Sequence, residues 1–348
     1  MTFTNKLSSI LNKASDRLEE AVHKQSSAPH IPYASKPSSS SQQYPAHNPD
    51  HGPSQPPNPP PPSHNPYWQP SLSSPIDTSF RHELGAHGWG NAEAQNYTSS
   101  PANSFLSPAG IHVHAIAASS HPDPSQRYTS ARLTSHQLLS RDRGVLSARI
   151  TAPIARGVWP AFWLLPADPF SWPGDGEVDI FEAWDGSAMN HSCLHWGYFN
   201  GEDWDKHRVI ETDLGSRILG RGVERDGVKT QVGGMRWQEK LGGREGMGTG
   251  AGVSFEFAWD DREGKEGRFV WYIDGRAVMK ARKPAGTRRM REWRILINIA
   301  MGGNVCKGRL PEDGVYEMVV RDLTMSEGRD GGWEGFESDF REAKEGHP

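Results

Sequence analysis

The alternation of apolar and polar positions sets residues 76–326 apart from the rest of the chain. Short strand-like runs separated by turn signals follow one another there, with hardly any helical periodicity. They include "GIHVHAIA", "GVLSARITAP", "GEVDIFEAW", "HSCLHWGYF", "VSFEFAW", "RFVWYIDGRAV", "WRILINIAMGG" and "YEMVVRDLTM". The pair Asp274-Gly275 between alternating segments is typical of a hairpin turn. So many strands without helices between them predict one all-β domain, a large antiparallel sandwich or barrel.

Residues 1–75 have a different pattern. Residues 1–24 place apolar side chains on one helical stripe with charges opposite, which predicts a short amphipathic helix. The pattern leaves open whether this helix docks on its own domain, is only partly formed, or contacts a partner protein or a membrane surface. Residues 25–75 contain 15 of the 27 prolines and almost no aliphatic side chains, which predicts a disordered, partly polyproline-II linker.

Two other segments also lack the alternating pattern. Residues 213–252 are rich in glycine and charge, and we expect a long loop or lid with at most one short strand. Residues 327–348 follow the last strand-like run, and we expect a tail that lies on the surface or frays.

Composition and charge narrow the classes of partner. The net charge is −4 and the estimated pI is about 6.4, so we expect neither nucleic-acid binding nor a polybasic membrane patch. No signal peptide or membrane-spanning run is seen, which favours a cytoplasmic or unconventionally secreted monomer. Cys193 and Cys306 are too few for a disulfide framework, so we expect free thiols.

The stretch "GEVDIFEAWDG" carries the candidate chemistry. It places Glu177, Asp179 and Glu182 within six residues among apolar neighbours. In a regular strand Glu177 and Asp179 share a face while Glu182 points away. Retaining cleavage of a glycosidic bond needs two carboxyl groups about 5–5.5 Å apart, one of them protonated. The spacing meets that need only if a one-residue bulge near Ile180 or Phe181 returns Glu182 to the face of the other two acids.

The segments around the acids are typical of a sugar cleft. Upstream lie Trp159, Trp163 and Trp172, and indole rings stack on the apolar faces of pyranose rings. Each of them also fits a place in the core, Trp163 above all because its run is apolar. Downstream, alternation puts His191, Cys193 and His195 on one face, so His195 is expected beside the acids if the two strands pair.

These motifs together resemble glycoside hydrolase family 16, and more closely its laminarinase-like endo-β-1,3(4)-glucanases. The resemblance is carried by "GWGNAEAQNYT", "GVWPAFWLLP", "WPGDGEVDIFE", "LHWG" and "INIAMGG", and it covers roughly residues 80–325. It implies a concanavalin A-like jelly roll of two curved antiparallel sheets, with a polysaccharide in a cleft on the concave face. By position, Glu177 is similar to the nucleophile, Glu182 to the general acid/base and Asp179 to the assisting acid, and Asn91 resembles a cleft-lining residue.

Several alternatives stay open beside a retaining endo-β-glucanase. The same fold supports a β-glucan transglycosylase and a non-catalytic glucan-binding module. The three acids with His191 or His195 also resemble a divalent-metal site, although such a site usually lies in a polar loop. No cofactor is expected. The resemblance implies a structural calcium on the convex face, but Val319 occupies the usual aspartate position, and only a shifted register would bring Asp322 there.

Overall fold

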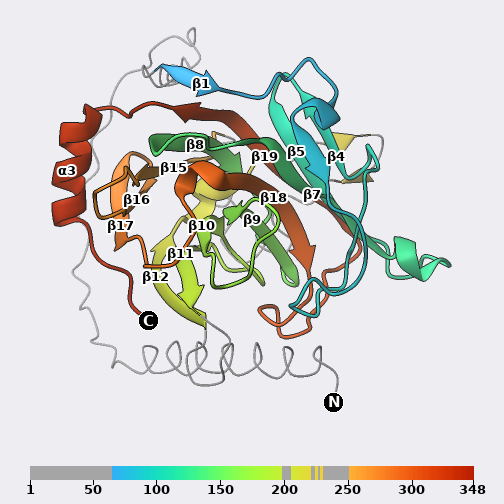
Figure 1. Cartoon of the computed structure of the whole chain (residues 1–348). Coiled ribbons are helices and arrows are strands. Elements are labelled where there is room, and N and C mark those ends of the chain that lie inside the picture. The colour runs from blue at the N-terminus through green and yellow to red at the C-terminus, as the bar shows by residue number, and fades with distance from the viewer. Residues whose placement is uncertain (1–64, 198–204, 221–223, 226–227, 230–250) are drawn as a thin grey trace, which may run out of the picture.

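The computed structural model describes residues 65–197, 205–220, 224–225, 228–229 and 251–348, and these form two β-sheets packed face to face (Figure 1). The expected helix at residues 1–24, most of the expected linker and residues 230–250 lie outside the described residues. Among the described residues, no helix is long and apolar enough to cross a bilayer. The all-β sandwich predicted from the alternation is confirmed.

The seven-stranded sheet carries the acid-bearing strand near one edge. Its order, from edge to edge, is β12 (Asp205–Asp213), β11 (Met189–Gly197), β10 (Glu177–Glu182), β9 (Val158–Pro166), β18 (Trp293–Met301), β7 (Arg132–Leu138) and β2 (Phe80–His82). All neighbours in the described part of this sheet are antiparallel.

The ten-stranded sheet covers the other side of the core. Its main order is β17 (Arg276–Arg282), β16 (Arg268–Ile273), β15 (Val253–Asp260), β8 (Arg143–Thr151), β19 (Gly314–Ser326), β5 (Gly110–Ala117), β6 (Tyr128–Ser130) and β3 (Asn96–Tyr97). Two further strands join it: β1 (Pro66–Trp68) pairs with β19, and β4 (Ser104–Ser107) pairs with β5. The shorter elements are β13 (Glu224–Arg225), β14 (Val228–Lys229), the 3-10 turns η1 (Ile76–Thr78), η2 (Pro124–Gln126), η3 (Gly215–Ile218) and η4 (Met290–Glu292), and the helix α3 (Gly332–Glu342).

The core between the sheets follows from the period-2 alternation. On β15, Phe255, Phe257 and Trp259 point inward, and on β18 the inward positions include Ile295 and Ile297. Each is essentially removed from water, and burial of such a side chain contributes about 1.5–3 kcal/mol. The alternate positions of the seven-stranded sheet are thereby held on its outer face.

The predicted hairpin is confirmed at the turn between β16 and β17. Asp274 and Gly275 have φ of 48° and 74°, the two positive values that a tight primed turn requires. The Asp274 carboxylate accepts a hydrogen bond from the backbone N–H of Ser254 at 3.0 Å, which holds the turn against the neighbouring strand.

The expected start of the domain needs a correction, and the structure decides between the two expectations for the C-terminal segment. The domain begins at Pro66 rather than at residue 76, because β1 pairs with β19 and the Tyr67 hydroxyl donates to the Leu139 carbonyl at 2.6 Å. The segment 327–348 lies on the surface, which is one of the two expected outcomes, and it is not frayed. Its helix α3 buries Phe336 against the outer side of β16 and forms ion pairs with it, such as Arg268 with Glu337.

The segment 213–252 contains more structure than the predicted lid. The turn η3 follows β12 directly, and Ile218 is fully buried in the main core. The short hairpin of β13 and β14 lies further along, where one short strand at most was expected. Only residues 213–220, 224–225, 228–229 and 251–252 of this segment are described.

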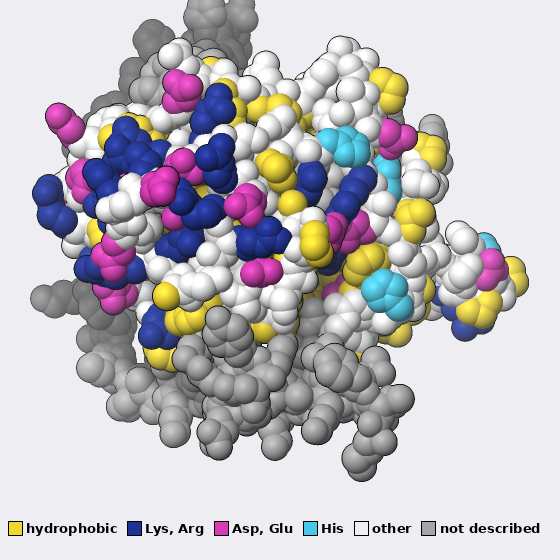
Figure 2. Space-filling model, in the orientation of Figure 1, with side chains coloured by type: hydrophobic (Ala, Val, Ile, Leu, Met, Phe, Trp, Pro, Cys, Tyr) yellow, Lys and Arg dark blue, Asp and Glu magenta, His cyan; other side chains and the backbone are white. Residues whose placement is uncertain are grey.

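Charged side chains of both signs are interleaved on the face of the molecule that Figure 2 shows. Near α3 they form a network in which Asp260 pairs with Arg262 and Arg268 at 2.7 and 3.2 Å. The Asp260 side chain is only 1% exposed, so these ion pairs compensate a buried charge rather than link two solvated ones.

Candidate active site on the seven-stranded sheet

The strand β10 contains the predicted one-residue bulge. Against β9, Asp179 pairs with Trp163 and Phe181 pairs with Phe162, so Ile180 is the extra residue. Ile180 and Phe181 therefore both point into the core, where they are 1% and 0% exposed. The bulge returns Glu182 to the outer face that Glu177 and Asp179 share, and the structural condition inferred from the spacing is met.

Two residues that the sequence analysis missed hold the bulge. The Asp179 carbonyl accepts a hydrogen bond at 2.9 Å from Nε1 of Trp271, a buried residue of the opposite sheet. Asn190 on β11 accepts from the Glu182 N–H at 3.1 Å through its side-chain oxygen. A bulge leaves backbone groups without ladder partners, and a buried orphan costs about 1–3 kcal/mol. These contacts make the irregular strand the stable one.

Glu182 has the environment of a carboxyl group that stays protonated. Its Oε1 accepts a hydrogen bond from Nε1 of Trp159 at 2.6 Å. The pKa of Glu182 is raised well above its usual value, first because the carboxyl is removed from water and then by the negative charges of Asp179 and Glu177. The charge of His195 and the bond from Trp159 act in the opposite direction but are outweighed.

The strand β11 brings His195 beside the acids, as the alternation predicted. His195 lies directly opposite Glu177 in the register, and Cys193 lies opposite Asp179. Nε2 of His195 is 3.4 Å from Oδ2 of Asp179 and 3.2 Å from Sγ of Cys193. On the next strand, His207 pairs with His195, which extends the row of polar side chains across the outer face.

The two cysteines are free and buried, as expected. Burial raises the pKa of each thiol to about 12. A thiol in that state is a poor nucleophile, so neither cysteine competes with the acids for a chemical role.

The three predicted tryptophans take different positions. Trp159 and Trp163 lie on β9 at outer-face positions, and the expectation that Trp163 packs in the core is wrong: it pairs with Asp179, and its Nε1 donates to Oδ1 of Asn298 at 2.7 Å. Trp172 lies in the loop before β10, with its ring centroid 6.4 Å from that of His195. All three are partly exposed, as sugar-stacking residues must be.

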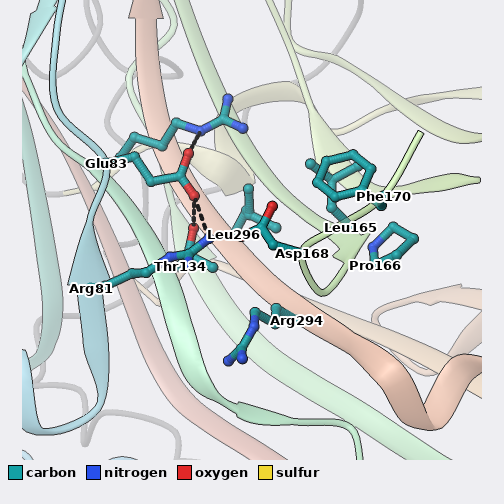
Figure 3. A pocket seen from close by; sticks show the side chains of 10 residues that line it. Arg81, Glu83, Thr134, Leu165, Pro166, Asp168, Phe170, Arg294 and Leu296 are labelled. Atoms are coloured by element: carbon teal, nitrogen blue, oxygen red, sulfur yellow. Dashed lines mark hydrogen bonds and ion pairs between the residues drawn. The ribbon is translucent and has the colours of Figure 1, made fainter. Parts of the chain in front are cut away.

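A pocket of about 350 Å³ lies on the same sheet face, over β2, β7, β9 and β18 (Figure 3). Its lining includes the three arginines Arg81, Arg132 and Arg294 and the two acids Glu83 and Asp168. The Arg132 guanidinium lies 4.7 Å from the centre of the Trp163 ring and donates to Glu83 at 3.0 Å. Arg132 therefore joins the pocket to the outer-face tryptophans. The sequence analysis missed it, because only strand pairing brings β7 to this region.

The predicted position Asn91 lies in the loop between β2 and β3, beside the end of β18. Its amide nitrogen is 3.5 Å from Oε1 of Glu93, and the Ala94 N–H donates to the Met301 carbonyl at 2.9 Å. Glu93 is buried and accepts from Nε2 of Gln95 at 2.5 Å, so these two polar side chains satisfy each other inside the fold. No contact between Asn91 and the three acids is among the described interactions.

Two groups of side chains have ligand atoms close enough together to hold a metal ion, within the part of the chain that the structure describes. One consists of Asp179, Cys193 and His195 beside the acids. Its single carboxylate and its protonated thiol offer few of the oxygen ligands that calcium or magnesium prefers. The other consists of His112, His114 and Glu317 on the ten-stranded sheet.

The fold and the site define a β-jelly-roll domain with three carboxyl groups on the outer face of one sheet. Residues 90–214 match the family described as "XgeA-like, catalytic GH16 domain". This match, over 125 of the 348 residues, agrees with the resemblance to glycoside hydrolase family 16 that the motifs carry.

Curated relatives show the same resemblance, and a solved structure shares the fold. The chain is 34% identical over 128 residues to a beta-glucanase of Rhodothermus marinus and 35% identical over 135 residues to glucan endo-1,3-beta-glucosidase A1 of Niallia circulans. Each match covers 34% of this chain, and the chain spans only 44% and 20% of those two relatives. The catalytic domain of an endo-1,3-beta-glucanase from Thermotoga petrophila shares the fold with a TM-score of 0.53 and 20% identity, over 76% of this chain and 98% of that domain.

Proposed function

We propose that this protein is a retaining endo-β-glucanase that cleaves β-1,3 or mixed β-1,3/1,4 linkages. The observation that carries the proposal is the bulge at Ile180, which gathers three acids on one sheet face and leaves one of them, Glu182, with a raised pKa. A retaining glycosidase requires two carboxyl groups in opposite protonation states. The glucanase names of the two relatives support the substrate class.

In the proposed mechanism, Glu177 is the nucleophile and Glu182 the general acid/base. Glu177 attacks the anomeric carbon while Glu182 protonates the leaving oxygen, which gives a covalent glycosyl-enzyme. Glu182 then removes a proton from the water that attacks the same carbon, and both carboxyl groups return to their starting states. Asp179, between them in the strand, adds the negative charge that helps to keep Glu182 protonated.

The neighbouring side chains suggest how the sugar is held. Trp159 orients Glu182 through its hydrogen bond and, with Trp163 and Trp172, offers aromatic surface for stacking on pyranose rings. His195 lies beside Asp179 at 3.4 Å and is placed to hold that carboxylate in position. The pocket in Figure 3 continues this surface past Trp163 and has space for further sugar units of a chain.

The test measures reducing ends released from laminarin and lichenan by the full-length chain. We expect hydrolysis of at least one of the two, with the β-anomer appearing first in the ¹H NMR spectrum of the products. Glu177→Gln should lower kcat about 10⁴-fold or more, the scale of loss when a catalytic group that acts in a unit is removed. Glu263→Gln, in the exposed turn after β15, is the matched control and should leave kcat unchanged.

Three results would contradict the proposal, and the first two each point to a named alternative. Binding of laminarin without turnover by the wild type would indicate a glucan-binding module. Products longer than the substrate, formed when acceptor oligosaccharides are added and in preference to hydrolysis, would indicate a transglycosylase. Turnover that Glu177→Gln leaves intact would remove the assigned nucleophile.

A further inference from the structure

A cluster of His112, His114 and Glu317 lies on the ten-stranded sheet, away from the proposed active site. The two histidines lie on β5 and Glu317 lies on the neighbouring strand β19, while β4 pairs with β5 (Figure 1). Ile111 and Val113 of β5 point into the core, so by alternation the two histidines point to the outer side. Glu317 lies directly opposite His114 in the register, which places its carboxylate on the same side.

The side chains converge on one carboxylate oxygen. Nδ1 of His112 is 2.8 Å and Nε2 of His114 is 3.1 Å from Oε1 of Glu317. A zinc ion bound at about 2.0–2.2 Å by tetrahedrally arranged ligands separates them by about 3.3–3.5 Å. The present distances are therefore a few tenths of an ångström shorter than a metal requires. Metal binding would require these atoms to move apart by that amount.

The surroundings fix the His112 ring and satisfy its second nitrogen. The ring of Phe105 on β4 stacks on that of His112 at a centroid distance of 4.4 Å and an angle of 8°. Nε2 of His112 lies 2.7 Å from the Ser107 hydroxyl. A second hydrogen bond of this kind orients a ligating histidine and sets its tautomer in known metal sites. Arg321 interacts electrostatically with Glu317, and its guanidinium donates to the Thr151 hydroxyl at 3.1 Å.

We propose that His112, His114 and Glu317 bind a divalent transition-metal ion, with zinc the preferred metal. Two imidazoles and one carboxylate are the borderline ligands that zinc selects over calcium, and a water molecule completes the fourth position. On binding, the ring proton of His112 moves from Nδ1 to Nε2, and Nε2–H then donates a hydrogen bond to the Ser107 hydroxyl. The ring proton of His114 moves from Nε2 to Nδ1, and neutral rings release no proton. The ion ties β5 to β19, so its role is structural.

The test uses the full chain, freed of metal with a chelator and dialysed, then titrated with zinc chloride in a calorimeter. We expect zinc to bind at this one site and to raise the Tm, because a ligand that binds only the folded state stabilises it. His114→Ala and the near-isosteric Glu317→Gln should each remove that site and weaken binding at least tenfold. His136→Ala, an exposed histidine on β7, is the matched control and should retain it.

The second candidate group requires its own control. Zinc bound through Asp179, Cys193 and His195 would be lost in Cys193→Ser and kept in Glu317→Gln, and that pattern would overturn the proposal. Equal zinc binding by the wild type and Glu317→Gln would also overturn it, as would calcium binding that depends on Glu317 but not on either histidine. A change of the His112 tautomer on zinc addition, seen in ¹⁵N NMR spectra, would support it independently of stability.

Discussion

The two sheets carry clusters of the same residue types with opposite effects on a central glutamate. On the seven-stranded sheet, burial and the charges of Asp179 and Glu177 raise the pKa of Glu182 well above its usual value. On the ten-stranded sheet, burial would raise the pKa of Glu317, but hydrogen bonds from His112 and His114 outweigh it and lower the pKa to about 2. The neighbours, rather than burial alone, decide which glutamate stays protonated.

The two pKa shifts have opposite effects on the stability of the folded protein: the site on β10 lowers it, and the cluster on the ten-stranded sheet raises it. A raised carboxyl pKa means that the folded state holds a proton that the unfolded chain releases at neutral pH, so folding is penalised there. A lowered pKa has the reverse sign. Glu182 is thus retained at a cost to stability, as expected for a chemical role.

The largest expected effect concerns the protonated acid. Glu182→Gln should lower kcat/KM on laminarin about 10²–10⁴-fold, because proton transfer to the leaving oxygen is lost. For the wild type, kcat/KM should fall as pH rises through the raised pKa of Glu182, and this limb should be absent in the variant. Formation of the glycosyl-enzyme from an aryl glycoside with a good leaving group should be much less affected. A wild-type profile without an alkaline limb would contradict the raised pKa.

The next largest effect concerns the cluster of His112, His114 and Glu317. It is measured in the presence of a chelator, so that no metal ion is bound. Glu317→Gln should lower the free energy of unfolding at pH 7 by about 2 kcal/mol, allowing for partial solvent screening. The contribution of Glu317 is complete above its ordinary pKa of 4.5 and is lost as pH falls from there towards about 2. Urea titrations at pH 7 and pH 3 should therefore show a smaller difference between variant and wild type at pH 3. If variant and wild type differ in the free energy of unfolding by the same amount at pH 7 and at pH 3, the ionised carboxylate of Glu317 is not the source of the difference.

The smallest effect has the opposite sign. Glu182→Gln should raise the free energy of unfolding at pH 7 by about 0.5–2 kcal/mol, because a neutral amide avoids the cost of charging a buried carboxyl. The gain should shrink as pH falls to the ordinary range of a glutamate, where both folded and unfolded chains are protonated. Thermal unfolding at pH 4 and pH 7 measures it, with Glu263→Gln as the exposed control. A loss of stability at pH 7 would show that the hydrogen bond from Trp159 outweighs the charge effects.

Much of the site could be predicted because it is local in sequence. The acids, Trp159 and Trp163 lie within 24 residues, and alternation shows which positions share a face and where a bulge is needed. The contacts that hold the bulge could not be predicted in this way. Trp271 lies on the opposite sheet, 92 positions from Asp179, and no periodicity connects them. The expectation that Trp163 packs in the core was wrong for a related reason. An apolar run in the sequence does not show which strands will pack against its residues.

The order of apolar and polar residues along the chain determined the all-β class, the hairpin at Asp274-Gly275 and the group of three acids, because each depends on neighbours a few positions apart. Tertiary structure alone decided what surrounds those groups. Tertiary packing placed Arg132 against Trp163, docked α3 on the surface where a surface-lying or frayed tail was expected, and brought His114 opposite Glu317 across 203 positions. The pKa of a carboxyl group depends on charges and donors within a few ångströms, and only the folded chain brings these together.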